Sequence, residues 1–269
     1  MVDIKGKDGI EYSFHIAKPL KKFLDEKVIK RINTRDKDYV MLVSGYEGSG
    51  KSTFGSQMAK YVDPNFCLDR MCFSAEEFKK AIYDAAKGEC VVYDEAVTGM
   101  TAGGSITKVG RLLKSLMMQM RQKNLFVIVI IPSVFELNKY AVLHRAMSLF
   151  HVWEKKNRYC WVGYNKKDTK RIYITGKKNN VIKVRSRFNG RFYGKMGIDI
   201  DEYKEKKAYA LEEEEEGQER VDKFSRQRDF AFKLLWDILK SKKKVFELQE
   251  NSEYPISYKR MATILGKQV

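Results

Sequence analysis

The segment Gly45-Tyr46-Glu47-Gly48-Ser49-Gly50-Lys51-Ser52 follows an apolar run at residues 39–43 and precedes a proline-free stretch at residues 53–61. It matches the pattern G-x-x-x-x-G-K-[S/T] of phosphate-binding loops. A strand, this loop and a helix in that order surround a β-phosphate with backbone N–H groups and a helix N-terminus. The sequence therefore predicts a nucleoside triphosphate site made by Gly45, Tyr46, Glu47, Gly48, Ser49, Gly50, Lys51, Ser52 and Thr53.

The pattern also assigns chemistry to the two residues that end it. We expect Lys51 to reach the β- and γ-phosphates and Ser52 to ligate Mg²⁺. About forty residues later, a short apolar run at 90–93 ends in the carboxylates Asp94 and Glu95. Beside a phosphate loop, the first carboxylate of such a pair is expected to help hold Mg²⁺, and the second to act as general base on the attacking water. Taken alone, the same pair also fits the capped start of a helix.

A third apolar run, residues 125–131, is typical of a buried parallel strand, and Pro132 and Ser133 follow it. Ser133 is the candidate sensor of the γ-phosphate. A serine that caps the next helix explains the position equally well, and the two roles are compatible.

Taken together, these landmarks resemble the P-loop ATPases that carry a glutamate after the Walker B aspartate. Within that division, residues 94–152 resemble the HerA/FtsK-like DNA translocases and the related viral DNA-packaging and zonular-occludens-toxin-like ATPases. The likeness lies in Asp94-Glu95-Ala96, Arg121-Gln122-Lys123-Asn124, Pro132 and Arg145. The resemblance implies ATP and Mg²⁺ as cofactors, DNA as a partner, a homo-oligomeric ring, and a portal or other docking protein.

In such a ring, a basic side chain of one subunit enters the site of its neighbour and lowers the barrier to phosphoryl transfer. Arg121 is the first candidate for this role and Arg145 the second. The alternative for each is an arginine on a solvated basic face.

The fold class that follows is α/β, with a P-loop NTPase core around a mainly parallel central sheet. We expect an N-terminal extension at 1–38, the core at 39–153, a basic β-rich extension at 154–211 and a helical region at 212–269. In the third segment, runs of alternating polarity at 159–164, 171–175 and 181–185 predict a β-meander, with Asn165-Lys166-Lys167-Asp168 as one of its turns. In the last segment, residues 257–266 resemble the first helix and turn of a helix-turn-helix.

Charge favours a nucleic-acid partner. The chain carries 52 basic and 35 acidic side chains, a formal net charge of +17. Residues 154–207 hold 17 of the basic and 6 of the acidic side chains, a net charge of +11, with aromatic residues interleaved. Basic groups that neutralise phosphates, beside rings that stack on bases, are typical of nucleic-acid binding. The alternative is a solvated basic face whose aromatic residues belong to the core.

Composition predicts a cytoplasmic protein. The sequence shows no signal segment at its start and no apolar run of the length that crosses a bilayer. Its four cysteines have neither C-x-x-C spacing nor a nearby histidine pair, so we expect free thiols in a reducing compartment.

The sequence as a whole therefore favours an ATPase that couples hydrolysis to DNA translocation or packaging, in a virus or mobile element. Two other classes remain open. An ATP-dependent assembly switch, such as a helicase loader or a DNA-bound scaffold, would use the same phosphate site. A small-molecule kinase would share the loop, but the basic segment and Glu95 argue against it.

Overall fold

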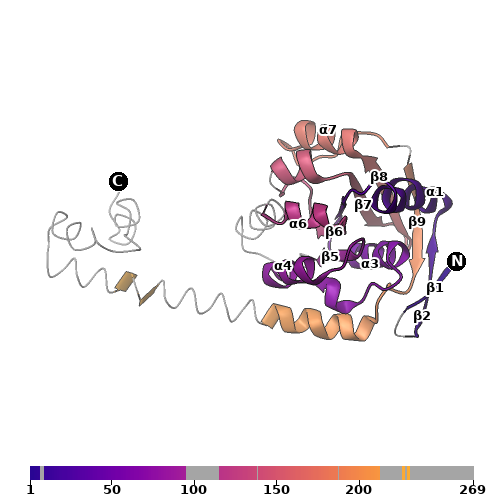
Figure 1. Ribbon diagram of the computed structural model, residues 1–269. Coiled ribbons are helices and arrows are strands. Elements are labelled where there is room, and N and C mark those ends of the chain that lie inside the picture. The colour runs from indigo at the N-terminus through magenta and orange to yellow at the C-terminus, as the bar shows by residue number, and fades with distance from the viewer. Residues whose placement is uncertain are drawn as a thin grey trace, which may run out of the picture. The chain divides into compact units, whose positions relative to one another are not determined.

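The computed structural model describes residues 1–6, 9–94, 115–137, 139–186, 188–212, 226–227 and 229–230. Residues 1–210 form one compact unit and residues 211–269 a second. The described part of the first unit is an α/β structure on a nine-stranded mixed sheet (Figure 1). The segments predicted as 1–38 and 39–153, and all but the last residue of 154–211, lie in this first unit.

Five strands of the sheet are parallel, in the order β7-β3-β6-β5-β4. Their bounds are β3 Tyr39–Ser44, β4 Met71–Cys72, β5 Cys90–Asp94, β6 Phe126–Ile131 and β7 Ser148–Glu154. Every residue of β3, β5 and β6 is buried, as expected for strands covered on both faces. The apolar runs of the sequence therefore predicted these strands correctly.

Four further strands extend the sheet beyond β7 in antiparallel pairing, and they make it mixed. They are β8 Tyr159–Asn165, β9 Phe188–Gly194, β2 Glu11–Ile16 and β1 Val2–Lys5, in that order. In β2 the residues Tyr12, Phe14 and Ile16 are buried and alternate with more exposed ones, so this strand covers the core with one face. The first residues of the chain thus complete the sheet.

Helices cover both faces of the parallel strands. The elements are α1 Lys18–Phe23, the π-helical η1 Leu24–Ile29, α2 Lys30–Asn33, α3 Lys51–Val62, the short 3₁₀ turn η2 Leu68–Arg70, α4 Ala75–Asp84, α6 Met117–Gln122, the π-helical η4 Ala141–Arg145 and α7 Lys166–Gly176. One face packs Met41 and Val43 of β3 against the α1–α2 segment and α3. The other packs Val40 and Leu42 against α4, α6, η4 and α7. The result is a three-layer arrangement with the sheet as the middle layer.

The predicted β-meander is wrong beyond its first strand. Residues 159–164 do form a strand, β8, but the predicted turn at 165–168 is the start of α7. The side chain of Asn165 caps this helix by accepting a hydrogen bond of 3.0 Å from the backbone N–H of Asp168. The predicted strand at 171–175 is therefore helical, and residues 181–185 form no strand. Thr169, Ile172 and Tyr173 are buried at helical spacing, and this face packs against β7 and η4. Tertiary packing therefore favours a helix over the strand that the alternating β-branched residues suggested.

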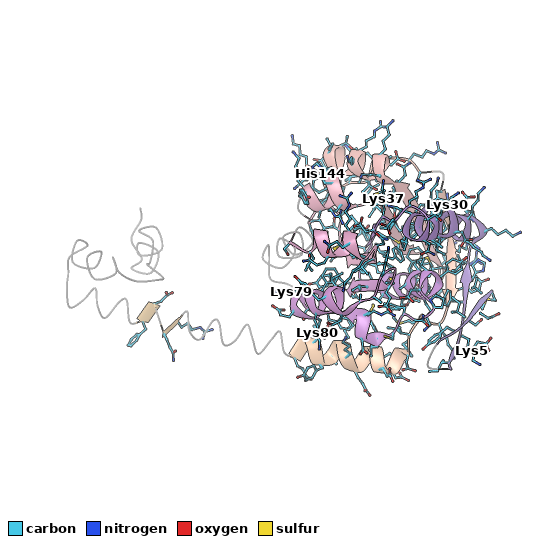
Figure 2. The ribbon with its side chains drawn as sticks, in the orientation of Figure 1. Lys5, Lys30, Lys37, Lys79, Lys80 and His144 are labelled. Carbon is cyan, nitrogen blue, oxygen red and sulfur yellow. The ribbon has the colours of Figure 1, made fainter. Side chains whose placement is uncertain are left out.

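Positive charge is spread over the surface of the first unit. Exposed basic side chains lie on the helices and on β1, and Figure 2 labels Lys5, Lys30, Lys37, Lys79, Lys80 and His144 among them. The basic surface therefore extends well outside residues 154–207.

The helical region predicted at 212–269, including residues 257–266, falls outside the described residues except at 212, 226–227 and 229–230. Residues 200–212 are helical and begin inside the first unit. Within the described residues, no helix is both long enough and apolar enough to span a lipid bilayer.

Candidate functional site

Residues 45–52, called the glycine loop below, connect the carboxyl end of β3 to the first residue of α3. Gly48 and Gly50 have φ angles of 72° and 82°, which glycine adopts at little cost. A Cβ at Gly45 would lie 2.2 Å from the backbone oxygen of Val152 on β7, so a side chain has no room there. The backbone N–H of Phe54 donates to the oxygen of Gly50 at 2.9 Å and starts the helix. The loop geometry therefore requires the glycines that the pattern contains.

Lys51 is buried at the N-terminus of α3. Its Nζ donates a hydrogen bond of 2.7 Å to the backbone oxygen of Tyr46, so the ammonium group points back into the glycine loop. Burial lowers the pKa of Lys51, while the carboxylates of Asp94 and Glu47 act in the opposite direction. A buried cation with a lowered pKa gains stability from an anion placed beside it. The position suits the phosphates of a nucleotide.

Asp94 ends β5 and is fully buried, separated from β3 in the sheet by β6. The hydroxyl of Tyr203, from the helical segment 200–212, donates to Oδ2 of Asp94 at 2.9 Å. The side chain of Ser52 lies close enough to this hydroxyl to lower its pKa. The hydroxyl of Tyr203 therefore lies beside both residues predicted to hold Mg²⁺. Burial and the charge of Asp94 raise the pKa of Tyr203, so this hydroxyl stays protonated as a donor.

The donor set at this point fits Mg²⁺. No group of three or more His, Cys, Asp or Glu side chains is suited to a metal within the described residues. Magnesium in nucleotide sites uses one or two protein oxygens, and phosphates and water supply the rest. The carboxylate of Asp94 and the hydroxyl of Ser52 are such a pair of oxygens. A metal held by both would compete with the contacts of Tyr203.

The other predicted site residues lie in different places. Glu95 is outside the described residues. Ser133 follows β6 and lines the same cavity as Gly45 and Tyr46, and its Oγ accepts a hydrogen bond of 3.3 Å from the backbone N–H of Phe135. Ser133 is therefore next to the glycine loop. Residues 134–136 form a turn, so Ser133 stabilises a turn and does not cap a helix there, and its role as a γ-phosphate sensor stays a prediction.

The two arginines lie at the opposite, amino-terminal ends of the parallel strands. Arg121 is exposed near the end of α6, before β6 begins. Arg145 ends η4, before β7, and forms an ion pair with Asp38, which precedes β3. Neither arginine is near the glycine loop of its own chain, and action in the site of a neighbouring subunit stays a prediction for both.

A cavity of about 880 Å³ opens beside the glycine loop. Its lining includes Ser44 at the end of β3 and His151 on β7. The Oγ of Ser44 and the Nδ1 of His151 are 3.2 Å apart. Burial lowers the pKa of His151, and the charge of Lys51 lowers it further. The imidazole is therefore neutral at pH 7 and is available as a hydrogen-bonding group at the edge of the site.

Sequence reasoning missed Tyr203 and the aromatic support of the loop. A Cβ at Gly50 would lie 3.1 Å from the ring of Phe192 and 3.2 Å from the ring of Tyr159, which belong to the antiparallel strands β9 and β8. No local pattern marks these residues, because all three reach the loop through tertiary packing. The start of α7, in contrast, was marked by the Asn165 cap.

No family model and no curated protein matches the chain. Among solved structures, the chain is similar to the N-terminal domain of zonular occludens toxin from Neisseria meningitidis. The match has 16% sequence identity and a TM-score of 0.34, and it covers 48% of this chain and 84% of that domain. The assignment of the site therefore depends on its own geometry.

Proposed function

We propose that this chain is a Mg²⁺-dependent ATPase that couples hydrolysis to the movement of DNA, as a ring that serves translocation or packaging in a virus or mobile element. The observation that supports the ATPase part best is the meeting of Ser52 and Asp94 at one hydroxyl, that of Tyr203. The buried Lys51 lies in the same site, since the charge of Asp94 acts on its pKa. Phosphoryl transfer is catalysed mainly by positioning and charge, and these residues supply both.

Each residue of the site then has a part in the reaction. The backbone N–H groups of the glycine loop bind the β-phosphate, and Lys51 neutralises charge on the β- and γ-phosphates. Ser52 and Asp94 hold Mg²⁺, which when bound neutralises charge that develops on the phosphates. Glu95 takes the proton of the attacking water and Ser133 contacts the γ-phosphate. Arg121 or Arg145 of a neighbouring subunit completes the site.

The DNA part of the proposal is supported by charge. The formal net charge is +17, and exposed basic side chains cover several elements of the first unit (Figure 2). A surface of this kind attracts the phosphate backbone independently of base sequence. A motor that moves along DNA needs binding of that type.

The contacts of Tyr203 favour a second candidate function, an ATP-dependent assembly switch. The helical segment 200–212 contacts both proposed metal ligands through this residue, so binding of nucleotide with Mg²⁺ would change its contacts. A nucleotide-controlled segment that runs along the chain into residue 211, where the second unit begins, could regulate assembly instead of producing movement. Both functions use the same nucleotide site. They differ in whether ATP hydrolysis drives movement along DNA or controls assembly.

Phosphate release from ATP, measured with and without DNA at low salt, tests the proposal. For a motor we expect DNA to stimulate the rate several-fold, and we expect Glu95→Gln to abolish turnover while ATP still binds. Turnover that does not respond to DNA, with normal ATP binding, would favour the switch. Full activity in Glu95→Gln would contradict the assigned chemistry.

A further inference from the structure

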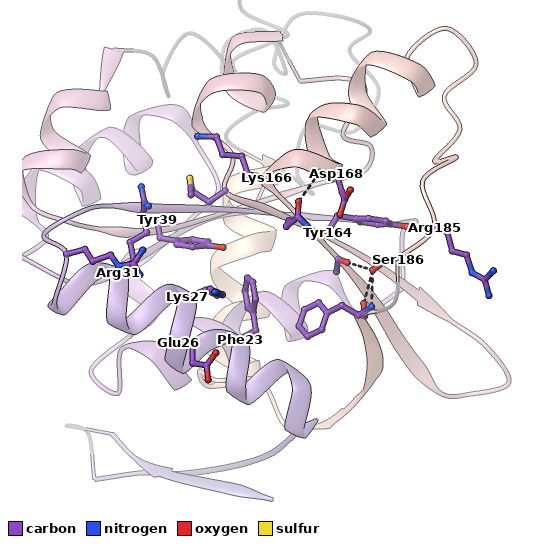
Figure 3. A pocket seen from close by; sticks show the side chains of 15 residues that line it. Phe23, Glu26, Lys27, Arg31, Tyr39, Tyr164, Lys166, Asp168, Arg185 and Ser186 are labelled. Carbon is purple, nitrogen blue, oxygen red and sulfur yellow. Dashed lines mark hydrogen bonds between the residues drawn. The ribbon is translucent and has the colours of Figure 1, made fainter.

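A second cavity, of about 730 Å³, lies at the other end of β3 (Figure 3). Tyr39, the first residue of β3, lines this cavity, whereas Ser44 at the other end of the strand precedes the glycine loop. The α1–α2 segment, the carboxyl end of β8, the start of α7 and the residues Arg185, Ser186 and Phe188 complete its wall. The cavity is thus separate from the nucleotide site and connected to it by one buried strand.

Basic side chains dominate the lining of this cavity. It contains two acidic residues, Glu26 and Asp168, and Glu26 is 3.8 Å from Lys22. The basic members are Lys27, Arg31, Arg35, Lys166 and Arg185. In the part of the chain that the structure describes, none of these five forms a salt bridge. The cavity therefore has an excess of positive charge that its own acidic groups do not balance.

The neighbours of Lys166 increase this excess. Burial lowers the pKa of Lys166, and the charges of Lys170, Arg31 and Arg145 lower it further, with only Asp38 acting against them. Asp38 is already held by Arg145 through an ion pair and, through its backbone oxygen, by Nε of Arg31 at 2.8 Å. An anionic group in the cavity would relieve the repulsion among these cations.

Aromatic rings form the apolar part of the wall. The half-buried rings of Phe23 and Phe188 have centroids 5.4 Å apart, and the buried Tyr39 and Tyr164 lie beside them (Figure 3). The ring of Phe188 fits only because residue 163 is glycine, where a Cβ would lie 2.4 Å from it.

Hydrogen bonds fix the backbone beside Phe188. The hydroxyl of Ser186 donates to the oxygen of Gly163 at 2.5 Å and accepts from the N–H of Phe188 at 3.1 Å. The aromatic wall is therefore a preformed part of the fold, as in most small-ligand sites.

We propose that this cavity binds a short segment of single-stranded nucleic acid, with backbone phosphates on Lys27, Arg31 and Lys166 and a base against the rings of Phe23 and Phe188. Cations combined with accessible rings are what sequence-tolerant single-strand sites use, and the bases of a duplex are not free to stack on a protein ring. The volume is within the usual range of about 300–1,000 Å³ for small-ligand pockets. The proposal rests on the DNA part of the proposed function and adds the strand form and the site.

Fluorescence anisotropy of the full chain with labelled oligothymidine of about 20 nucleotides, and with a duplex of equal length, tests this site. We expect the double variant Lys27→Gln/Lys166→Gln to bind the single strand at least about tenfold more weakly. The slope of log K against log salt should fall by about 1.4, since each lost phosphate contact changes it by about 0.7. Phe188→Leu should weaken binding about tenfold without changing the slope, because it removes a stacking surface but no charge.

The matched control is Lys79→Gln/Lys80→Gln, which removes two exposed charges on α4 outside the cavity (Figure 2). Its single-strand affinity should fall much less than that of the cavity variant, by about twofold or less, because two exposed charges outside the cavity add only general attraction to phosphates. Equal affinity in the cavity variant and the control would overturn the proposal, as would a preference for the duplex. A third outcome would also overturn the proposal: the chain binds a polyglutamate peptide through Lys27 and Lys166 but does not bind oligothymidine. The ligand of the cavity would then be an acidic protein segment and not nucleic acid. ATP hydrolysis without DNA, measured on the same variants, shows separately whether the ATPase proposal holds.

Discussion

At the scale of single residues, the proposed nucleotide site depends on a glycine at a position with no room for a side chain and on one buried cation. Gly45 faces the backbone oxygen of Val152 at a distance that excludes a side chain, and Lys51 bonds to the oxygen of Tyr46 inside the loop. The local pattern predicted that a glycine and a lysine stand here, whereas the oxygen that Gly45 faces comes from distant β7. The contact of Tyr203 with Asp94 joins residues 109 positions apart, and no local pattern could predict it.

Alanine substitutions at Gly45 and Gly48 compare two causes of lost stability: a steric clash of the new Cβ, and strain in a backbone with positive φ. Gly45→Ala should destabilise the protein by about 3 kcal/mol or more, because its Cβ would meet the oxygen of Val152 at 2.2 Å. Gly48→Ala should cost only about 1–2 kcal/mol, because Gly48 has a positive φ but a Cβ there would meet no atom within 4 Å. Urea unfolding of both variants measures the difference. Equal losses would show that the close approach of β7 to the loop is not maintained in solution.

The lowered pKa of His151 predicts a dependence of stability on pH. The unfolded chain takes up a proton at the usual histidine pKa of about 6.5, whereas the folded chain does so only at lower pH. The free energy of unfolding should therefore fall as the pH drops below about 6.5, until the folded pKa is passed. Burial also lowers the pKa of His15, so His151→Asn should reduce this fall without removing it. Urea unfolding between about pH 7.5 and pH 5.5 measures it, and an identical fall in the variant would contradict the assignment.

At the scale of elements, the sequence predicted those whose signals are local. The apolar runs predicted β3, β5 and β6. The start of α4 carries another local signal, because Ser74 Oγ accepts from the N–H of Glu77 at 3.1 Å. The segment 166–176 was assigned wrongly because its β-branched residues alternate. The deciding factors were the Asn165 cap and burial of one helical face. Strand β2 pairs with distant β9, and β1 pairs with β2, and sequence periodicity does not show the long-range pairing.

The helical segment 200–212 should act on the site through Tyr203. Tyr203→Phe removes the hydrogen bond to Asp94 and the hydroxyl beside Ser52, and it leaves the oxygens of both residues available to hold Mg²⁺. A hydrogen bond to a charged group contributes about 1.5–3 kcal/mol, so the variant should bind ATP with Mg²⁺ about tenfold more tightly. Calorimetric titration measures this change.

Tyr61→Phe is the matched control for Tyr203→Phe. It removes another tyrosine–carboxylate contact, the 2.7 Å hydrogen bond from Tyr61 to Asp25. Its ATP affinity should equal that of the unmodified chain. Weaker binding in Tyr203→Phe, with normal binding in the control, would show that the tyrosine supports the site instead of competing for its ligands.

At the scale of the whole molecule, two sites lie at opposite ends of the same buried strand. The glycine loop follows the carboxyl end of β3, and the basic cavity lies at its amino end, where Tyr39 is part of the wall. A buried strand between the proposed nucleotide site and the proposed nucleic-acid site is a short path by which one could affect the other. The sequence predicted the first site from one continuous segment, whereas the second is assembled from four separate segments and needed the fold.

The central claim is that the glycine loop binds ATP through Lys51, with Mg²⁺ held by Ser52 and Asp94. Calorimetric titration of ATP into the unmodified chain, Lys51→Ala and Asp94→Asn, each with and without Mg²⁺, tests it most directly. We predict binding by the unmodified chain that strengthens with Mg²⁺, loss of binding in Lys51→Ala, and binding in Asp94→Asn that no longer responds to Mg²⁺. No binding by the unmodified chain, or unchanged affinity in Lys51→Ala, would contradict the account.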